Sequence, residues 1–359
     1  MSSLTEYKCL NCGGTMSFDS GSQQMKCPYC STSFDAETLR IYDEESSRQP
    51  SEELSWDLGA GTEWKEGEQE GILVYNCSSC GGEIISDKNT LASSCPYCSS
   101  NVVMSGQLAG VLRPDLVIPF KLDKQAAKES LNAHLQKKRF LPKIFKDENH
   151  IDEIKGIYVP FWLFDADAQA SFRYRAEKKR KWSDSRNNYQ ETSHYYVFRE
   201  GSIGFDLIPS DSSSKMADDL MDSIEPFNYA EAKEFTSAYL AGYLADKYDI
   251  EPEVCEERAN ERVKQSTQEA FAATVKGYSN VRTDYSSIRL VNGKAKYALL
   301  PVWILNTTWK DEKYIFAMNG QTGKFVGNLP LDKGAYWRTF GTLAAVISAA
   351  VFGLQWLIL

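Results

Sequence analysis

The tetrapeptide CPYC at residues 27–30 recurs at residues 95–98, and this repeat decides how the N-terminal third of the chain folds. Each CPYC is preceded by another close cysteine pair, in CLNCGG at 9–14 and in CSSCGG at 77–82. Fourteen residues separate the two pairs in both copies. The spacing C-x2-C-x14-C-x2-C is typical of a tetrahedral site with four cysteine ligands, because each close pair forms a knuckle and the middle segment folds back. The sequence therefore predicts two zinc ribbons.

Two other uses of paired cysteines fit this pattern less well. CPYC is also the redox centre of glutaredoxins, but such an enzyme has one CPYC inside a βαβ unit, whereas these segments are short, polar and rich in turns. Disulfides form in an oxidising compartment, and the N-terminal stretch MSSLTEYKCL has no apolar signal-peptide core. Zinc remains the favoured interpretation for all eight cysteines.

The predicted sites are structural rather than catalytic. Each ribbon is too short to fold without a metal or a disulfide, and four thiolates leave no coordination position for a water molecule. We expect two Zn2+ ions, and the two glycines after each first knuckle supply positive backbone φ angles. The predicted zinc ligands are Cys9, Cys12, Cys27, Cys30, Cys77, Cys80, Cys95 and Cys98. A ninth cysteine, Cys255, lies in a helical stretch and is expected to be inert packing.

The C-terminal segment is the second strong signal. FGTLAAVISAAVFGLQWLIL at 340–359 has no charged residue, and a helix of this length spans the roughly 30 Å hydrocarbon core of a bilayer. Lys333 and Arg338 flank only its N-terminal side, which predicts a single-pass cell-membrane protein with its N-terminal bulk in the cytoplasm. The alternative is a buried core helix, which seldom stays apolar on all sides for so long.

A stripe of small residues runs along this predicted anchor. The residues recur every four positions and therefore share one helical face. They are Gly341, Ala345, Ala349 and Gly353. Close approach over small side chains favours helix pairing in lipid, so we expect the anchor to pair with its own copy or with a partner's helix. An unpaired anchor is the open alternative.

Charge is concentrated in one segment. The formal net charge is −9, and residues 41–70 hold ten acidic and two basic side chains, which accounts for −8 of it. Such a stretch is too polar to bury and repels itself, so we predict a disordered linker. Trp56 and Trp64 within it are expected either to contact a neighbouring ribbon or to dock a partner.

The remaining sequence predicts one α+β domain. YVPFWLF at 158–164 resembles LLPVWIL at 299–305, and strand-rich segments with polar turns follow both. We expect antiparallel β meanders, with helices at 123–138, about 228–248 and 252–276 packed on the sheet. The predicted organisation is ribbon 1 (1–40), acidic linker (41–70), ribbon 2 (71–105), central domain (110–332) and transmembrane anchor (336–359).

The central domain carries no catalytic signature. His134, His150 and His194 have no sequence context that pairs them with a nucleophile, and Asp165 with Asp167 is expected to be a solvated strand end. NGQTGKF at 319–325 lacks the phosphate-loop spacing and predicts a hairpin turn. The chain is therefore expected not to be an enzyme, and no catalytic residue or organic cofactor is predicted.

Nucleic acid and anionic lipid remain possible ligands of one basic segment. RYRAEKKRKW at 173–182 interleaves basic and aromatic residues, as hairpins that contact phosphates do, and a solvated charged turn is the third interpretation. The acidic ribbons and linker oppose binding to nucleic acid.

Together, the doubled ribbons, GIYVPFW, KYALLPVWILNTTWKDEKYIFAMNGQTGK and the terminal anchor resemble the bacterial YdjG-like membrane proteins, which are often labelled TFIIB-type zinc-ribbon or primosomal-helicase-like proteins. The helicase label has no support, since the chain has no Walker motif. The resemblance implies a non-enzymatic adaptor that recruits PspA-type or SPFH-type envelope proteins to the membrane during envelope stress. A membrane-tethered nucleic-acid-binding protein is the alternative function.

Overall fold

The computed structural model describes residues 6–46, 52–90, 92, 94–108, 110–146, 153–310 and 312–358. The chain divides into two compact units, each assembled from separate stretches of sequence. Unit 1 comprises Met1–Ser55, Ala166–Phe205 and Glu261–Asn292, and unit 2 comprises Trp56–Asp165, Asp206–Asn260 and Gly293–Leu359. The predicted division at 110–332 therefore differs from the observed one, because residues of this range belong to both units.

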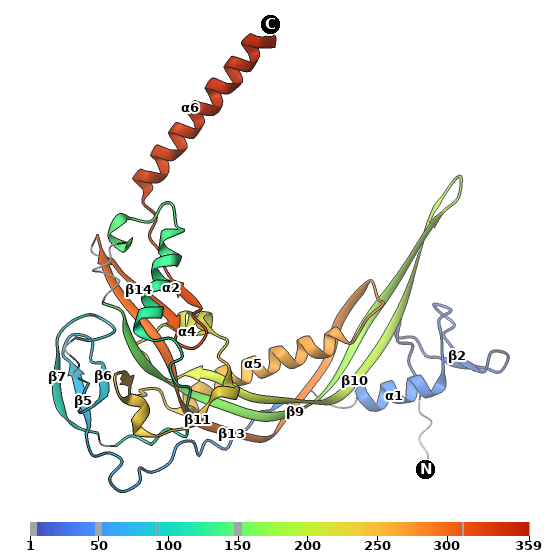
Figure 1. The fold of residues 1–359 in the computed structure, drawn as a ribbon. Coiled ribbons are helices and arrows are strands. Elements are labelled where there is room, and N and C mark those ends of the chain that lie inside the picture. Colours follow the sequence, from blue (N-terminus) through green and yellow to red (C-terminus); the bar gives the residue numbers. More distant parts are fainter. Residues whose placement is uncertain are drawn as a thin grey trace. The chain divides into compact units, whose positions relative to one another are not determined.

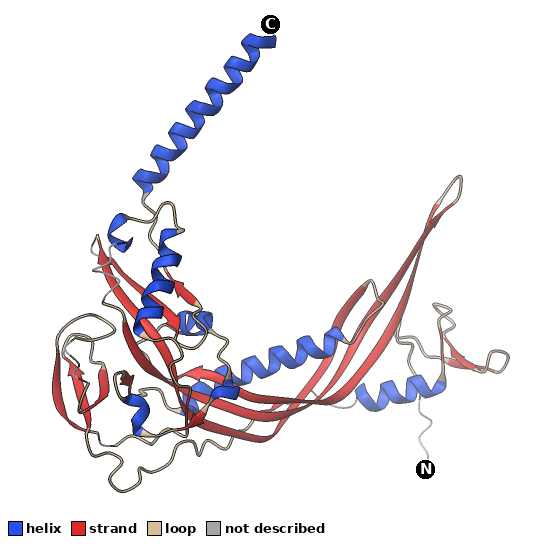
Figure 2. Cartoon of the chain, in the orientation of Figure 1, coloured by secondary structure: helices blue, strands red, loops and turns tan. Residues whose placement is uncertain are grey.

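Unit 1 contains ribbon 1 and portions of four long elements (Figures 1 and 2). Its own elements are β1 (Ser17–Asp19), β2 (Gln24–Lys26), β3 (Ser33–Phe34), α1 (Ala36–Ser46) and β4 (Glu52–Glu53). The long elements are β9 (Lys155–Ser183), β10 (Asn188–Asp211), α5 (Pro252–Ala273) and β13 (Asn280–Trp309). β1, β2 and β3 form a separate antiparallel sheet in which Met25 lies opposite Phe18 and Phe34. Ribbon 1 thus has a sheet and a small core of its own.

Unit 2 contains ribbon 2 and most of the remaining helices and short strands (Figure 1). Its strands are β5 (Ile72–Cys77), β6 (Glu83–Asp87), β7 (Val102–Gln107), β8 (Leu116–Val117), β11 (Lys233–Glu234), β12 (Leu244–Asp246), β14 (Glu312–Asn319) and β15 (Phe325–Gly327). Its helices are α2 (Lys124–Gln136), α4 (Asp218–Ile224), α6 (Lys333–Ile358) and the 3-10 turns η1 (Lys143–Lys146), η2 (Tyr229–Glu231) and η3 (Ser237–Leu240). Portions of the long strands complete the unit.

Ribbon 2 is part of a large sheet rather than a separate module. Twelve strands form this sheet, and its main path runs β11-β8-β13-β9-β12-β6-β5-β7. β5 pairs antiparallel with β6 and β7, and β6 pairs with β12, which in turn pairs parallel with β9. One of the three strands of ribbon 2, β6, therefore connects the ribbon through β12 to the central strand β9.

The two similar heptapeptides lie on β9 and β13, which are neighbours in this sheet. The matched prolines both offer their carbonyl oxygen to a loop, since Ser212 donates to Pro160 and Gly320 donates to Pro301. The matched tryptophans, Trp162 and Trp303, are almost fully buried. Their indole N–H groups donate to the carbonyl oxygens of Ile250 and Leu122. The similarity in sequence thus corresponds to equivalent local structure.

The second meander and two of the predicted helices are confirmed. β13, β14 and β15 pair antiparallel in sequence order, and the turn between β14 and β15 is the NGQTGKF segment. α2 begins after Asp123, whose side chain accepts the backbone N–H of Ala126. α5 begins at Pro252, and Gly277 has a φ of 88° beyond its end.

The helix predicted at about 228–248 is wrong. This stretch forms η2, β11, η3 and β12 instead. The apolar spacing that suggested a helix is satisfied by 3-10 turns and by strand pairing, since β12 lies between β6 and β9 in the sheet. Gly242 adopts a φ of 84°, which an uninterrupted helix does not allow. Tertiary pairing has overridden local periodicity here.

The disordered linker predicted at 41–70 is also wrong for the residues that the structure describes. α1 extends to Ser46, and residues 47–51 lie outside the described part of the chain. Glu68 forms an ion pair at 2.9 Å with Arg113, which is only 4% exposed. Burial raises the pKa of the Glu68 carboxyl, and the Lys65 amide and Arg113 more than offset this, so its pKa lies below the usual value. The part of the acidic segment from Trp56 onward is thus fixed within unit 2.

The two tryptophans of this segment pack within unit 2, against a core cluster that includes Ile72 and Ile85 of ribbon 2, in agreement with the expected contact with a neighbouring ribbon. Trp56 donates its indole N–H to Asn260 and packs edge-on against Phe164. Trp64 donates to the carbonyl oxygen of Val111 and packs against Phe235. Specific apolar and hydrogen-bonded contacts therefore outweigh the unfavourable charge of the segment.

Candidate metal centres

The structure brings the four cysteines of ribbon 1 into one cluster. The Sγ atoms of Cys9 and Cys30 lie 3.5 Å apart, as do those of Cys12 and Cys27. The four sulfur atoms lie within 4.8 Å of one another. Cys9 and Cys27 are buried, Cys30 is half-buried and Cys12 is exposed.

Ribbon 2 repeats this arrangement. Its two short Sγ–Sγ distances are 3.5 Å between Cys77 and Cys98 and 3.6 Å between Cys80 and Cys95. Its four sulfur atoms also lie within 4.8 Å of one another. Cys77 and Cys95 are buried, and the other two are half-buried. The eight cysteines predicted from the spacing thus form two tetracysteine clusters, and all of them are free thiols rather than disulfides.

Both clusters fit a tetrahedral Zn2+ ion. A Zn–S bond of about 2.3 Å places tetrahedral sulfur ligands roughly 3.8 Å apart, close to the separations observed. Four thiolates suit zinc and leave no position for a water or a substrate. When bound, the ion crosslinks two knuckles that are too small to be stable alone. The identity of the metal as zinc stays a prediction.

The same backbone turn shapes all four knuckles. The carbonyl of each first cysteine accepts the N–H four residues later, as in Gly13 to Cys9 at 2.8 Å and Ser31 to Cys27 at 3.0 Å. The residue after each second cysteine has a positive φ, between 60° and 77°. These residues are Gly13, Ser31, Gly81 and Ser99. Of the two glycines predicted after each first knuckle, only the first, Gly13 or Gly81, has the positive φ. The two serines were missed because serine seldom adopts this conformation.

A hydroxyl follows the last cysteine of each ribbon by two residues. The Sγ atom of Cys30 lies 3.2 Å from Oγ1 of Thr32, and hydrogen bonding by Thr32 lowers the pKa of this thiol to about 6. Burial raises the pKa of the Cys98 thiol, but the hydroxyl and the amide of Ser100 more than offset this and lower it to about 6. Both thiols are thus held ready to bind a cation as thiolates near neutral pH. The sequence contains a signal for these hydroxyls, since the last cysteine of each ribbon begins the pattern C-x-[ST].

The surroundings of the two sites differ sharply. Tyr29 of ribbon 1 is 77% exposed, whereas Tyr97, at the same place in CPYC, is 6% exposed and belongs to the core around Phe161 and Val302. The side-chain amide of Asn306 donates to the carbonyl oxygen of Pro96. The same four residues therefore form a surface in ribbon 1 and an internal contact in ribbon 2.

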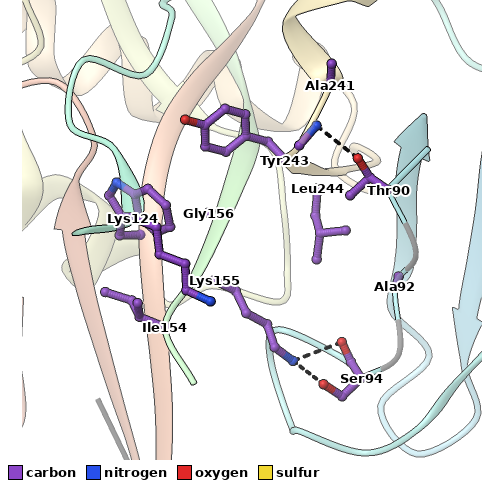
Figure 3. Close-up of a pocket in the computed structure, with 12 residues that line it drawn as sticks. Thr90, Ala92, Ser94, Lys124, Ile154, Lys155, Gly156, Ala241, Tyr243 and Leu244 are labelled. Atoms are coloured by element: carbon purple, nitrogen blue, oxygen red, sulfur yellow. Dashed lines mark hydrogen bonds between the residues drawn. The ribbon is translucent and has the colours of Figure 1, made fainter. Parts of the chain in front are cut away.

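A lysine of β9 connects the central sheet to ribbon 2. The ammonium group of Lys155 donates to the carbonyl oxygen of Ser94 at 3.0 Å and contacts that of Cys95 at 3.4 Å; Figure 3 shows its contacts with Ser94. Burial lowers the pKa of Lys155, and the nearby thiols oppose the shift. Lys155 also lines a cavity of about 460 Å³ beside Lys124 and Tyr243. Because its N–H groups are directed at ribbon 2, we assign Lys155 to holding the ribbon in place.

The other sequence candidates do not gather into a site. His134 packs against Phe325, His194 is exposed, and His150 lies outside the described residues. Asp165, expected to be solvated, instead pairs with Lys296 at 2.5 Å, and Asp167 accepts from Asn292. Cys255 is buried, as expected, and its thiol donates to the carbonyl oxygen of Asp211.

The basic segment at 173–182 has two parts. Arg173 and Arg175 both pair with Asp284 at 2.7 Å and are thus part of the sheet's ion pairs. Beyond them, residues 178–182 are exposed, and Trp182 stacks on Tyr189 across the hairpin. Only the hairpin end therefore remains open to the three alternatives considered for this segment.

One helix among the described residues is long and apolar enough to cross a membrane. It is α6, and the qualifying stretch is Lys333–Gly353, none of which is buried inside the protein (Figure 1). Its large apolar side chains are exposed, including Leu343 at 59% and Phe352 at 76%. These observations oppose the buried core helix and leave α6 as a candidate membrane span by its length and composition.

The fold and the two clusters define a sheet-rich double-ribbon protein with one candidate membrane-spanning helix. The chain belongs to the YdjG family. It is 33% identical over 341 residues to the uncharacterized protein YdjG of Bacillus subtilis (strain 168), and the match covers 95% of this chain and 94% of the relative. No family model and no solved structure matches the chain.

Proposed function

We propose that this protein is a non-enzymatic adaptor, anchored in the cell membrane by α6, that uses ribbon 1 to assemble proteins at the cytoplasmic face. The observation that carries this proposal is the unequal exposure of the two CPYC tyrosines, 77% for Tyr29 and 6% for Tyr97. Ribbon 2 serves as an internal example of how such a knuckle docks on a protein surface. Ribbon 1 offers the same groups with their docking face uncovered.

The exposed face of ribbon 1 has the composition of a protein contact. Phe18 on β1 is 56% exposed, in addition to Tyr29. Tyrosine and phenylalanine are enriched in protein interfaces, where a large apolar ring is desolvated. A closed tetrathiolate site beside them supports a rigid surface rather than a reaction.

The partners are expected from the family resemblance. PspA-type or SPFH-type envelope proteins are the proposed binding partners, with envelope stress as the condition of assembly. The exposed apolar surface of α6 supports a membrane anchor, and Lys333 with Arg338 on one flank supports a cytoplasmic position for the rest of the chain.

Affinity purification of the full chain from membranes, with nuclease treatment, tests the proposal. Partner proteins should co-purify with the chain, and nuclease treatment should not reduce their recovery. A Phe18→Ser, Tyr29→Ala double variant should recover only a small fraction of them. The matched control is Val103→Ser, which alters a 65% exposed apolar residue of ribbon 2. Equal recovery with both variants would exclude ribbon 1 as the docking surface.

The anchor is tested separately. A chain that ends before Tyr336 should move from the membrane fraction to the soluble fraction while it retains both metals. Carbonate-resistant attachment of this shortened chain would contradict the role of α6.

One observation supports the alternative of a membrane-tethered nucleic-acid-binding protein. The exposed basic residues of the hairpin end lie beside the stacked Trp182–Tyr189 pair, with Arg180 over the indole ring. Bases stack on such aromatic surfaces, and lysines contact phosphates. Salt-dependent binding of single-stranded oligonucleotides, lost in Arg180→Ala, Lys181→Ala, would favour this function, and nuclease-sensitive partners would agree with it.

A further inference from the structure

We propose that the two metal sites differ in how readily they release a bound ion. Ribbon 1 exchanges its ion with the solution, and exposes its thiolates to modification, while unit 2 stays folded. Ribbon 2 keeps its ion until unit 2 itself opens. This inference concerns the metal sites and does not depend on the adaptor function.

Little structure has to open around the cysteines of ribbon 1. Its sheet has three strands of three, three and two residues. Its buried core consists of Cys9, Met16, Cys27 and Leu39, so half of it is made of the ligands themselves. Cys12 is exposed already. Regions with few buried apolar contacts open locally without global unfolding, and such openings give a chelator access to the ion.

Ribbon 2 has no comparable local opening. Cys77, Cys95 and Tyr97 belong to the same core as Phe161 and Val302 of the central strands. Cys80 and Cys98 pack against that core. Release of the ion requires at least one knuckle to separate. Both knuckles of ribbon 2 share this core, and Lys155 of β9 and Asn306 of β13 also hold the second one. Exposure of these thiolates is therefore coupled to opening of the large sheet.

Direct hydrogen bonds add to this coupling. Lys155 holds the backbone on the N-terminal side of Cys95, and Asn306 holds the carbonyl of Pro96. The ammonium charge also compensates the net negative charge of a Zn2+ ion with four thiolates. Among the hydrogen bonds and ion pairs of the described residues of ribbon 1, no lysine or arginine contacts a knuckle. A lysine ammonium hydrogen-bonded to the knuckle backbone is thus a feature of ribbon 2 that the described residues of ribbon 1 do not share.

The test uses the intact, detergent-purified chain with two bound zinc ions. The chromophoric chelator 4-(2-pyridylazo)resorcinol in native buffer should remove one equivalent at least tenfold faster than the other. Cys12→Ser should lose only the fast phase. A single phase that releases both ions, or loss of the slow phase in Cys12→Ser, would overturn the proposal.

A second measurement applies even where Cys12→Ser fails to fold. Brief exposure to N-ethylmaleimide, followed by mass spectrometry, locates the accessible thiols. Each Sγ forms a bond to an alkene carbon, the neighbouring carbon takes a proton from water, and the Zn–S bond breaks. Ribbon 1 cysteines should be labelled first, with one zinc released, and early labelling of ribbon 2 would contradict the inference.

Matched variants outside the ligands test the cause. Lys155→Met and Asn306→Ala should accelerate the slow phase severalfold and leave the fast phase unchanged. Val103→Ser, on the exposed face of ribbon 2, should change neither phase. An unchanged rate of the slow phase in Lys155→Met and Asn306→Ala would show that these contacts do not retain the ion.

Discussion

Ribbon 1 and ribbon 2 share their cysteine spacing, their knuckle turns and their CPYC sequence, yet one has a four-residue core of its own and the other shares the core of unit 2. Local sequence sets the coordination geometry, because the ligands and the turns lie within a few residues of one another. Long-range packing sets what the metal stabilises. The comparison teaches that two identical motifs can serve as an independent surface module and as an integral part of a fold.

The largest contrast is expected from loss of a buried ligand. Cys95→Ser should destabilise unit 2 as a whole, because a structural zinc ion is worth roughly 10–16 kcal/mol in small metal domains. Cys27→Ser should leave unit 2 folded with one zinc. Metal analysis and thermal unfolding of both variants measure the difference, and a retained main transition in Cys95→Ser would remove the distinction between the ribbons.

The two tyrosines provide the next contrast. Tyr97→Ala removes a large ring from the core and should cost about 3–5 kcal/mol of unfolding free energy. Tyr29→Ala changes an exposed residue and should stay within about 0.5 kcal/mol. Urea unfolding of the two variants gives both values. Equal losses would mean that ribbon 1 is covered in solution.

A pH effect is expected from a buried carboxyl of unit 2, that of Asp246 on β12. Burial raises the pKa of Asp246 to about 7, although the Ser213 hydroxyl donates a hydrogen bond to the carboxylate. This carboxyl therefore binds its proton more tightly in the folded than in the unfolded state, so its contribution to stability is fully present below about pH 4 and is lost as the pH rises through about 7, a change on the order of 2–4 kcal/mol.

Asp246→Asn removes this titration and should flatten the stability profile between pH 5 and 8. Urea midpoints at the two pH values provide the measurement. Burial also raises the pKa of Asp211, to about 6, so part of the pH dependence should remain. An unchanged slope in Asp246→Asn would show that this carboxyl does not carry the effect.

The smallest effect should be the same in both ribbons. Ser31 and Ser99 have a φ of 60°, which glycine adopts without strain. Ser31→Gly and Ser99→Gly should each stabilise metal retention by up to about 1 kcal/mol. Competition with a chelator measures it. A gain in one ribbon and a loss in the other would show that the knuckles are not equivalent after all.

The sequence predicted what depends on near neighbours. The eight cysteines, the first turn glycine of each ribbon, the helix at 123–138 and the β14–β15 turn all follow from residues a few positions apart. The prediction of a disordered linker at 41–70 failed, because the summed charge does not show that Glu68 pairs with the buried Arg113 or that Trp56 contacts Asn260. Arg113 lies 45 positions from Glu68 in the sequence, and Asn260 lies 204 positions from Trp56.

The same difference between near and distant neighbours applies to the candidate sites. Spacing predicted each set of four ligands, but nothing near Tyr29 or Tyr97 indicates which knuckle packs on β9 and β13. Lys155 and Asn306 were missed because their contacts with ribbon 2 span 61 and 210 positions. The 228–248 helix failed for a related reason, since its residues pair with strands distant in sequence.

The prolines of the two heptapeptides have a consequence for strand pairing. Pro160 and Pro301 lack an N–H group and lie within neighbouring strands, where each donor normally has a fixed acceptor. A shift of either strand by one residue would move Trp162 or Trp303 to the opposite face, and would take the carbonyl of Pro160 or Pro301 away from the N–H of Ser212 or Gly320. The pair therefore acts as a register lock, which excludes slipped versions of the sheet during folding.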